Sequence, residues 1–198
     1  MRIQMFAIAA LTALTGTAGA QEKEARTGAV ISACTQVPSN LTPIYLAKQQ
    51  ASEMFGKAGV TLAWRSWNSC PIDAIRIIIS ERTKAADHPG ALGYALLPEG
   101  THIVVFWDRI QASATQRGVA PLLAHVYVHE ITHILEGAAR HSEAGIMKAH
   151  FTRDDIVEME TSPLPFAAID MNLMRAGIDR RRRATYTNLA TAAPIGPR

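Results

Sequence analysis

Two histidines and a glutamate lie within five consecutive residues, His129-Glu130-Ile131-Thr132-His133, in the pattern H-E-x-x-H. The two histidines are four residues apart, so on a helix they lie on one face and can bind the same metal ion. Imidazole nitrogens are good zinc ligands, and a neighbouring carboxylate can take a proton from a water at an open coordination position. The pattern therefore predicts zinc bound by His129 and His133, with Glu130 as the general base of a hydrolase.

The pattern lies inside an apolar segment that we expect to form a helix from Pro121 to Glu136. Because this segment is apolar on most sides, we predict a buried, central helix, and Gly137 suits its C-terminal cap. The alternative is a buried helix whose histidines only form hydrogen bonds in the core. His125, one turn before His129, is expected to support the site or the core, since successive steps of four residues drift around a helix.

A catalytic zinc ion is normally held by three protein side chains. Several side chains after the helix can supply the third ligand: His141, His150, Glu158 and Glu160. The two glutamates belong to a helix expected at residues 153–160, whereas the two histidines belong to the intervening loop.

Within this segment, Gly137 is followed by His141-Ser142 and then by Ile146-Met147, and in this order the chain resembles the metzincin clan of zinc peptidases. The resemblance implies that His129, His133 and His141 are the zinc ligands and that Met147 forms a turn beneath the metal. The metzincin pattern is H-E-x-x-H-x-x-G-x-x-H, whereas this chain has three residues in each of the last two gaps. Met147 follows the third histidine after only six residues, and no tyrosine follows it.

The resemblance also implies a fold, a zincin-like α+β domain with a mixed twisted sheet, a central active-site helix and a short C-terminal helical part. Periodicity in the sequence agrees with this order of elements. We expect helices at residues 44–55, 121–136, 153–160 and 167–177, strands at 60–64, 74–80, 91–97 and 101–107, and a polar loop at 111–118. The strand at 74–80 is the most apolar and should be central, and the last two strands should pair antiparallel.

The first twenty residues have the features of a secretory signal peptide, with cleavage after Ala20. We then expect a flexible segment at 21–33, a single catalytic domain at 34–178 and a basic, disordered tail at 179–198. The formal net charge of +3 falls to +2 when Arg2 is removed with the signal peptide. Because this charge is nearly neutral, we expect no nucleic-acid partner. The run Arg180–Arg183 is expected to be a solvated part of the tail, and no segment predicts stable membrane insertion.

The chain contains two cysteines, Cys34 and Cys70. In an exported protein an even number of cysteines favours a disulfide. The alternative is that Cys34 binds the metal as a removable inhibitory thiolate.

Together these features predict a secreted or periplasmic zinc metalloendopeptidase that acts on peptides or proteins. By its position before the motif and by the resemblance, the edge strand expected at 91–97 is the candidate to which an extended substrate would add. The alternative is an ordinary strand of the sheet that contacts no substrate. The alternative function is a secreted, non-catalytic protein of the same fold that binds a metal or a partner.

Overall fold

The computed structural model of the protein describes residues 28–36, 42–84 and 86–192. The expected signal peptide and most of the segment predicted to be flexible lie outside these residues. Within the described ranges, no helix combines the length and the apolar character needed to cross a membrane.

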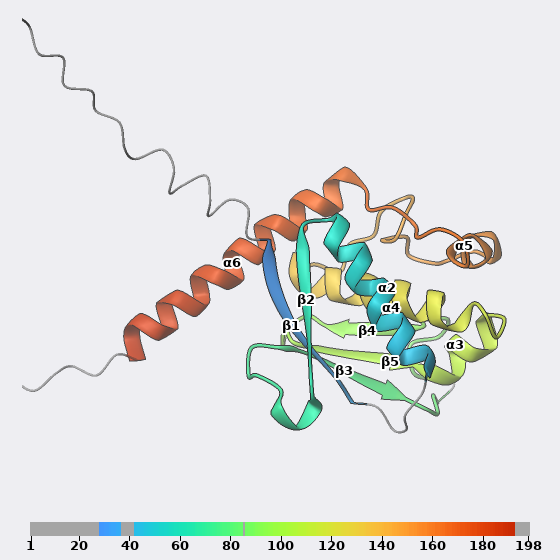
Figure 1. The fold of residues 1–198 in the computed structure, drawn as a ribbon, viewed down its shortest axis with the longest axis horizontal. Coiled ribbons are helices and arrows are strands. Elements are labelled where there is room, and N and C mark those ends of the chain that lie inside the picture. Colours follow the sequence, from blue (N-terminus) through green and yellow to red (C-terminus); the bar gives the residue numbers. More distant parts are fainter. Residues whose placement is uncertain (1–27, 37–41, 85, 193–198) are drawn as a thin grey trace, which may run out of the picture.

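Five strands form one mixed sheet, with the strands in the order β2-β1-β3-β5-β4 (Figure 1). The strands are β1 (Ala29–Gln36), β2 (Val60–Arg65), β3 (Ile75–Ser80), β4 (Gly93–Leu96) and β5 (His102–Phe106). All neighbouring pairs are parallel except β4 and β5, which are antiparallel. The predicted central position of β3 and the antiparallel pairing of the last two strands are therefore confirmed.

The strand β1 corrects the prediction that residues 21–33 are flexible, because residues 29–33 lie inside the sheet. Ala29 pairs with Val60 of β2, and Ala33 pairs with Ile75 of β3. Both partners are distant in sequence, so the strand is stabilised by tertiary pairing rather than by a local pattern. The folded domain consequently begins before residue 34.

Two helices pack against each other on one face of the sheet, α2 (Thr42–Lys57) and α4 (Val119–Glu136) (Figure 1). The alternation of β3 explains this arrangement, because Ile75, Ile77 and Ile79 are buried while the residues between them are only partly buried. The core is therefore a layer between one face of the sheet and these two helices.

A short helix, α3 (Trp107–Ser113), follows β5 directly and corrects the prediction of a loop from residue 111. Asp108 lies in its first turn, where a negative charge interacts favourably with the free N–H groups of a helix. The same carboxylate accepts hydrogen bonds from the backbone N–H and the hydroxyl of Thr83, at 2.9 and 2.6 Å. These contacts between α3 and a loop distant in sequence favour a helix at residues whose polar local sequence predicts a loop.

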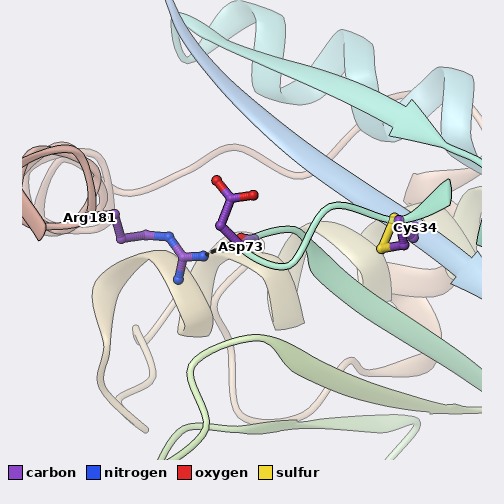
Figure 2. The surroundings of a disulfide bond; sticks show 4 residues. Cys34, Asp73 and Arg181 are labelled. Carbon is purple, nitrogen blue, oxygen red and sulfur yellow. Dashed lines mark hydrogen bonds between the residues drawn. A yellow bond between two sulfur atoms is a disulfide. The ribbon is translucent and has the colours of Figure 1, made fainter. Parts of the chain in front are cut away.

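Cys34 and Cys70 form a disulfide, as predicted, with their Cα atoms 5.9 Å apart. The bond links β1 to the loop after the short 3-10 helix Trp67–Ser69 (Figure 2). Since the described residues contain no free cysteine, the alternative of an inhibitory Cys34 thiolate is wrong.

The last two helices are α5 (Arg153–Met159) and α6 (Ala168–Ala192). The helix α6 continues well past residue 177, so residues 179–192 are helical rather than a disordered tail (Figure 1). Arg180 and Arg181, within the run of four arginines, bind backbone carbonyls of the domain. Arg180 donates to the carbonyl of Glu136 at 2.7 Å. Arg181 donates to the carbonyl of Gly100 at 2.8 Å and to that of Asp73 at 3.1 Å, and Figure 2 shows the bond to Asp73.

Candidate metal centre and cleft

The helix α4 carries His129, Glu130 and His133 through the middle of the molecule. Every residue of this helix is buried, as its apolar sequence predicts. It ends where Gly137 adopts the left-handed conformation, with φ of 69°, and donates to the carbonyl of His133 at 2.8 Å. A glycine adopts this conformation without steric strain, so it turns the chain sharply after the helix.

Two backbone carbonyls fix the protonation of the two helical histidines. His129 contacts the carbonyl of Ile146 through Nδ1 at 2.8 Å, and His133 contacts the carbonyl of Ala138 through Nδ1 at 2.9 Å. Because a carbonyl can only accept, each Nδ1 carries the proton and each Nε2 presents a lone pair. This is the tautomer in which imidazole binds a metal through Nε2.

The two Nε2 atoms face each other at 3.0 Å. Two lone pairs at this distance repel unless a cation or a proton lies between them. Two nitrogens bound to one tetrahedral zinc, each at about 2.05 Å, would be separated by about 3.3 Å. The pair formed by His129 and His133 is therefore close to the geometry of two zinc ligands.

The loop after α4 brings His141 to the same place. Each of His129, His133 and His141 offers a ring nitrogen, and these three atoms all lie within 4.8 Å of one another. His141 is exposed, whereas the other two are buried. In the described part of the chain no other set of His, Cys, Asp or Glu side chains meets the same criterion.

Burial keeps the three histidines neutral at neutral pH. For His129, burial and the neighbouring His133 lower the pKa to about 4. The pKa values of His133 and His141 are also lowered, in each case mainly by burial. Neutral imidazole is the form that binds a metal, so protons compete little with a metal ion at pH 7.

Glu130 is buried between α4 and the edge strand β4. Burial raises the pKa of its carboxyl group to about 8, and a hydrogen bond from the backbone N–H of Ala95 partly opposes this rise. A divalent cation bound by the adjacent histidines would favour the charged carboxylate and lower this pKa. A carboxyl group that titrates near neutral pH beside a candidate metal site is suited to act as a general base.

These side chains line a cleft of about 450 Å³ between β4, α4 and the loop at 139–151. The lining includes Glu130, the three histidines and the residues from Leu92 to Ala95. The strand β4 pairs only with β5 in the sheet, and its other side borders this cleft. The cleft thus combines an open strand edge with a cluster of three metal-binding side chains.

The fold of the chain is similar to that of archaemetzincin from Methanopyrus kandleri. The alignment has a TM-score of 0.54 and 11% sequence identity, and it covers 78% of this chain and 97% of that chain. At this identity the likeness concerns the fold alone. It supports the prediction of a mixed sheet with helices packed on it. No family model and no curated protein sequence matches the chain.

The other candidate ligands lie outside the histidine cluster. His150 lines the cleft, and the pKa of His141 is lowered first by burial and then by the nearby His150, but His150 does not belong to the cluster. Glu160 accepts a hydrogen bond from Thr115 at 2.7 Å, and Glu158 likewise lies outside the cluster.

His125 lies beside the site and forms hydrogen bonds within the core, which is one of the two roles predicted for it. Its Nε2 accepts from the backbone N–H of Leu164 at 3.0 Å, and its Nδ1 contacts the carbonyl of Pro121 at 2.7 Å. Both ring nitrogens are therefore occupied, and the ring links α4 to the chain between α5 and α6.

The turn at Met147 is buried and firmly held. Ser142 donates through its backbone N–H to the carbonyl of Met147 at 2.7 Å, and Ile146 donates to the carbonyl of Pro165 at 2.9 Å. The turn supports the site directly, because the carbonyl that orients His129 belongs to Ile146. The backbone groups of Ile146, Ala138 and Ala95 were not found from the sequence, since a carbonyl or N–H contributes no side-chain pattern.

Proposed function

We propose that the protein is a secreted zinc metalloendopeptidase, with His129, His133 and His141 as the zinc ligands and Glu130 as the general base. The observation that carries the proposal is the cluster of three neutral histidine nitrogens beside a buried carboxyl group in an open cleft. The similarity of fold to archaemetzincin, whose name places it among the metzincins, supports the same reading.

The donor set fits zinc. Three imidazole nitrogens leave a fourth position for water or substrate in a tetrahedral site, which distinguishes catalytic zinc sites from structural ones. When bound there, zinc would supply a Lewis acid that polarises a carbonyl group and makes water more acidic. A purely structural site would not need the carboxyl group of Glu130 beside it.

The residues of the chain would divide the rest of the reaction. Glu130 takes a proton from the attacking water and passes it to the nitrogen of the departing amine. The backbone N–H of Ala95 holds the carboxylate in place during this transfer. An extended peptide would lie along the free side of β4 by strand addition, so that its scissile carbonyl faces the histidines.

Export is a part of this proposal that rests on two features. The N-terminal segment has the composition of a signal peptide, and the Cys34–Cys70 disulfide is typical of oxidising compartments. The mature protein should therefore begin at Gln21 and be found outside the cytoplasm.

The proposal is tested by digesting a denatured protein mixture with the zinc-loaded enzyme. We expect cleavage that a chelator abolishes and that added zinc restores. Glu130→Gln should retain zinc and lose about two to four orders of magnitude in rate, the range for a positioned general base. Glu158→Gln, which changes an exposed glutamate outside the cluster, is the matched control and should cleave like the wild type.

The second candidate function is a non-catalytic protein of the same fold that binds a metal or a partner. The wild type would then bind zinc and cleave nothing across a broad peptide library. If Glu130→Gln cleaves at the wild-type rate, the protein is still a peptidase, but Glu130 is not its general base.

A further inference from the structure

Both chain neighbours of His141 are bound to one buried carboxylate, that of Asp170. Arg140 donates through Nη1 to Oδ1 of Asp170 at 2.7 Å, and the hydroxyl of Ser142 donates to the same oxygen at 2.6 Å. Arg140 also donates through Nη2 to the hydroxyl of Ser142 at 2.8 Å. The three side chains form a closed set of hydrogen bonds, and the backbone of His141 runs between two of them.

Asp170 is itself fixed in the frame of the active-site helix. It lies in the first turn of α6, its side chain is 0% exposed, and its second oxygen accepts from the backbone N–H of Ala167 at 2.9 Å. The helix α6 packs closely against α4 at Gly177, where an added Cβ would lie 1.6 Å from the carbonyl oxygen of Leu135. Asp170 therefore has a fixed position relative to α4, which carries the other two histidines.

This connection matters because His141 is the exposed member of the cluster and comes from a segment without helix or strand. His129 and His133 are positioned by a buried helix and by two backbone carbonyls. His141 has no comparable hydrogen bond among the described contacts of its ring. Its position depends on the loop, and the loop is attached through Arg140 and Ser142.

The network is poorly suited to a purely stabilising role. A second buried carboxyl group, that of Glu136, shares the same guanidinium at 3.4 Å, and its other oxygen has no hydrogen-bond partner. Burial raises the pKa of Glu136, as expected for a carboxyl group with incomplete compensation. Replacing a buried ionic network by apolar packing is often neutral for stability, and in some proteins such a network instead defines a unique geometry.

We propose that Asp170 is a positioning residue that sets the metal affinity of the site by holding His141 through Arg140 and Ser142. The inference rests on the proposed three-histidine metal site and extends it to residues that do not contact the metal. Groups that hydrogen-bond a metal ligand directly typically change metal affinity by 10- to 100-fold. Asp170 acts one step further away, through the two chain neighbours of His141.

The test compares Asp170→Asn with the wild type. An asparagine has one acceptor oxygen and one donor nitrogen, so it cannot accept from Arg140, Ser142 and the N–H of Ala167 at once. We expect the dissociation constant for zinc, measured by competition with a chromophoric chelator, to rise at least tenfold. With cobalt in place of zinc, the visible absorption bands should change in position or intensity as His141 is lost from the coordination sphere.

Asp108→Asn is the matched control. Asp108 also lies in the first turn of a helix, and its carboxylate accepts the backbone N–H and the hydroxyl of Thr83. These partners lie outside the loop at 139–151 that carries His141. This variant should lose stability without changing the zinc affinity or the cobalt spectrum.

A second variant decides the matter if Asp170→Asn does not fold. Ser142→Ala removes only the hydroxyl group and should weaken zinc binding several-fold. The inference is overturned if a variant that folds has the same zinc affinity and the same cobalt spectrum as the wild type. The proposed metal site would be unaffected by that result. A wild type that binds neither metal would instead overturn the proposed function itself.

Discussion

Replacing Glu130 by glutamine should stabilise the metal-free protein, and the gain should grow with pH. Burial raises the pKa of this carboxyl group in the folded protein from 4.5 to about 8. Between these two values the folded protein holds a proton that the unfolded chain has released. The contribution of this carboxyl group to the stability of the wild type is therefore fully present below pH 4.5 and is lost as the pH rises from 4.5 through about 8.

The size of the effect follows from the pKa difference. A rise from 4.5 to about 8 corresponds to about 5 kcal/mol if the buried carboxylate gained no water on ionising. Water entering the open cleft reduces this penalty, so we expect a gain of about 2–4 kcal/mol for Glu130→Gln above pH 8. The side-chain oxygen of glutamine can still accept from the N–H of Ala95, so that hydrogen bond does not offset the gain.

The assay is denaturant unfolding of both proteins with excess chelator at pH 5, 7 and 9. The free energies of unfolding should differ little at pH 5, and Glu130→Gln should be the more stable at pH 9. Other groups that titrate, including the buried histidines, are common to both proteins and cancel in the difference. Equal stability of the two proteins at every pH would refute the argument, because it would mean that Glu130 is solvated and ionises normally.

Three further predictions concern packing, the disulfide and the histidines. Gly177→Ala should destabilise the protein by about 1–3 kcal/mol in denaturant unfolding, because the added methyl group overpacks the contact with α4. The control is Gly56→Ala, at a helical glycine where nothing lies within 4 Å of the added Cβ. It should be neutral or stabilise the protein by up to about 1 kcal/mol. Similar effects of the two changes would contradict the close approach of α6 to α4. Replacing both Cys34 and Cys70 by alanine should lower the free energy of unfolding by up to about 4 kcal/mol, because the disulfide closes a loop with a sequence separation of 36. An unchanged denaturant midpoint would contradict this prediction. Because burial lowers the pKa of His129 to about 4, protonation of this side chain should weaken zinc binding only well below pH 6.5. Zinc affinity would be measured by chelator competition. A loss of affinity centred at pH 6.5 would contradict a buried, neutral histidine site.

The sequence predicted the features that depend on local patterns. The spacing of His129 and His133 placed both on one face of a helix, and the structure brings their Nε2 atoms to 3.0 Å. The apolar run at 74–80 predicted a central strand, and the short turn before 101–107 predicted an antiparallel pair. Each of these signals lies within one element or within two elements joined by a short turn.

Features that depend on distant partners could not be predicted in this way. The strand β1 follows a polar, glycine-containing segment, and it is held by parallel pairing with residues about thirty to forty positions later. The helix α6 includes Arg180 and Arg181, which donate to carbonyls of α4 and of two loops. Without those partners, a run of arginines resembles a solvated tail.

The candidate site was predicted in its side chains but not in its supports. The order of glycine, histidine and methionine favoured His141 over His150, and the structure places His141, but not His150, in the cluster. The role proposed for Asp170 has no signal in the sequence, because it lies 29 residues after His141 with no motif around it. The connection appears only when α6 is placed against α4.

The most direct test of the metal centre is a crystal structure of the zinc-loaded mature protein, with anomalous scattering measured at the zinc absorption edge. We predict one zinc ion per chain, bound to Nε2 of His129, Nε2 of His133 and a ring nitrogen of His141, with solvent in the fourth position and Glu130 beside it. Zinc bound elsewhere, or a site in which His150, Glu158 or Glu160 replaces His141, would contradict the account.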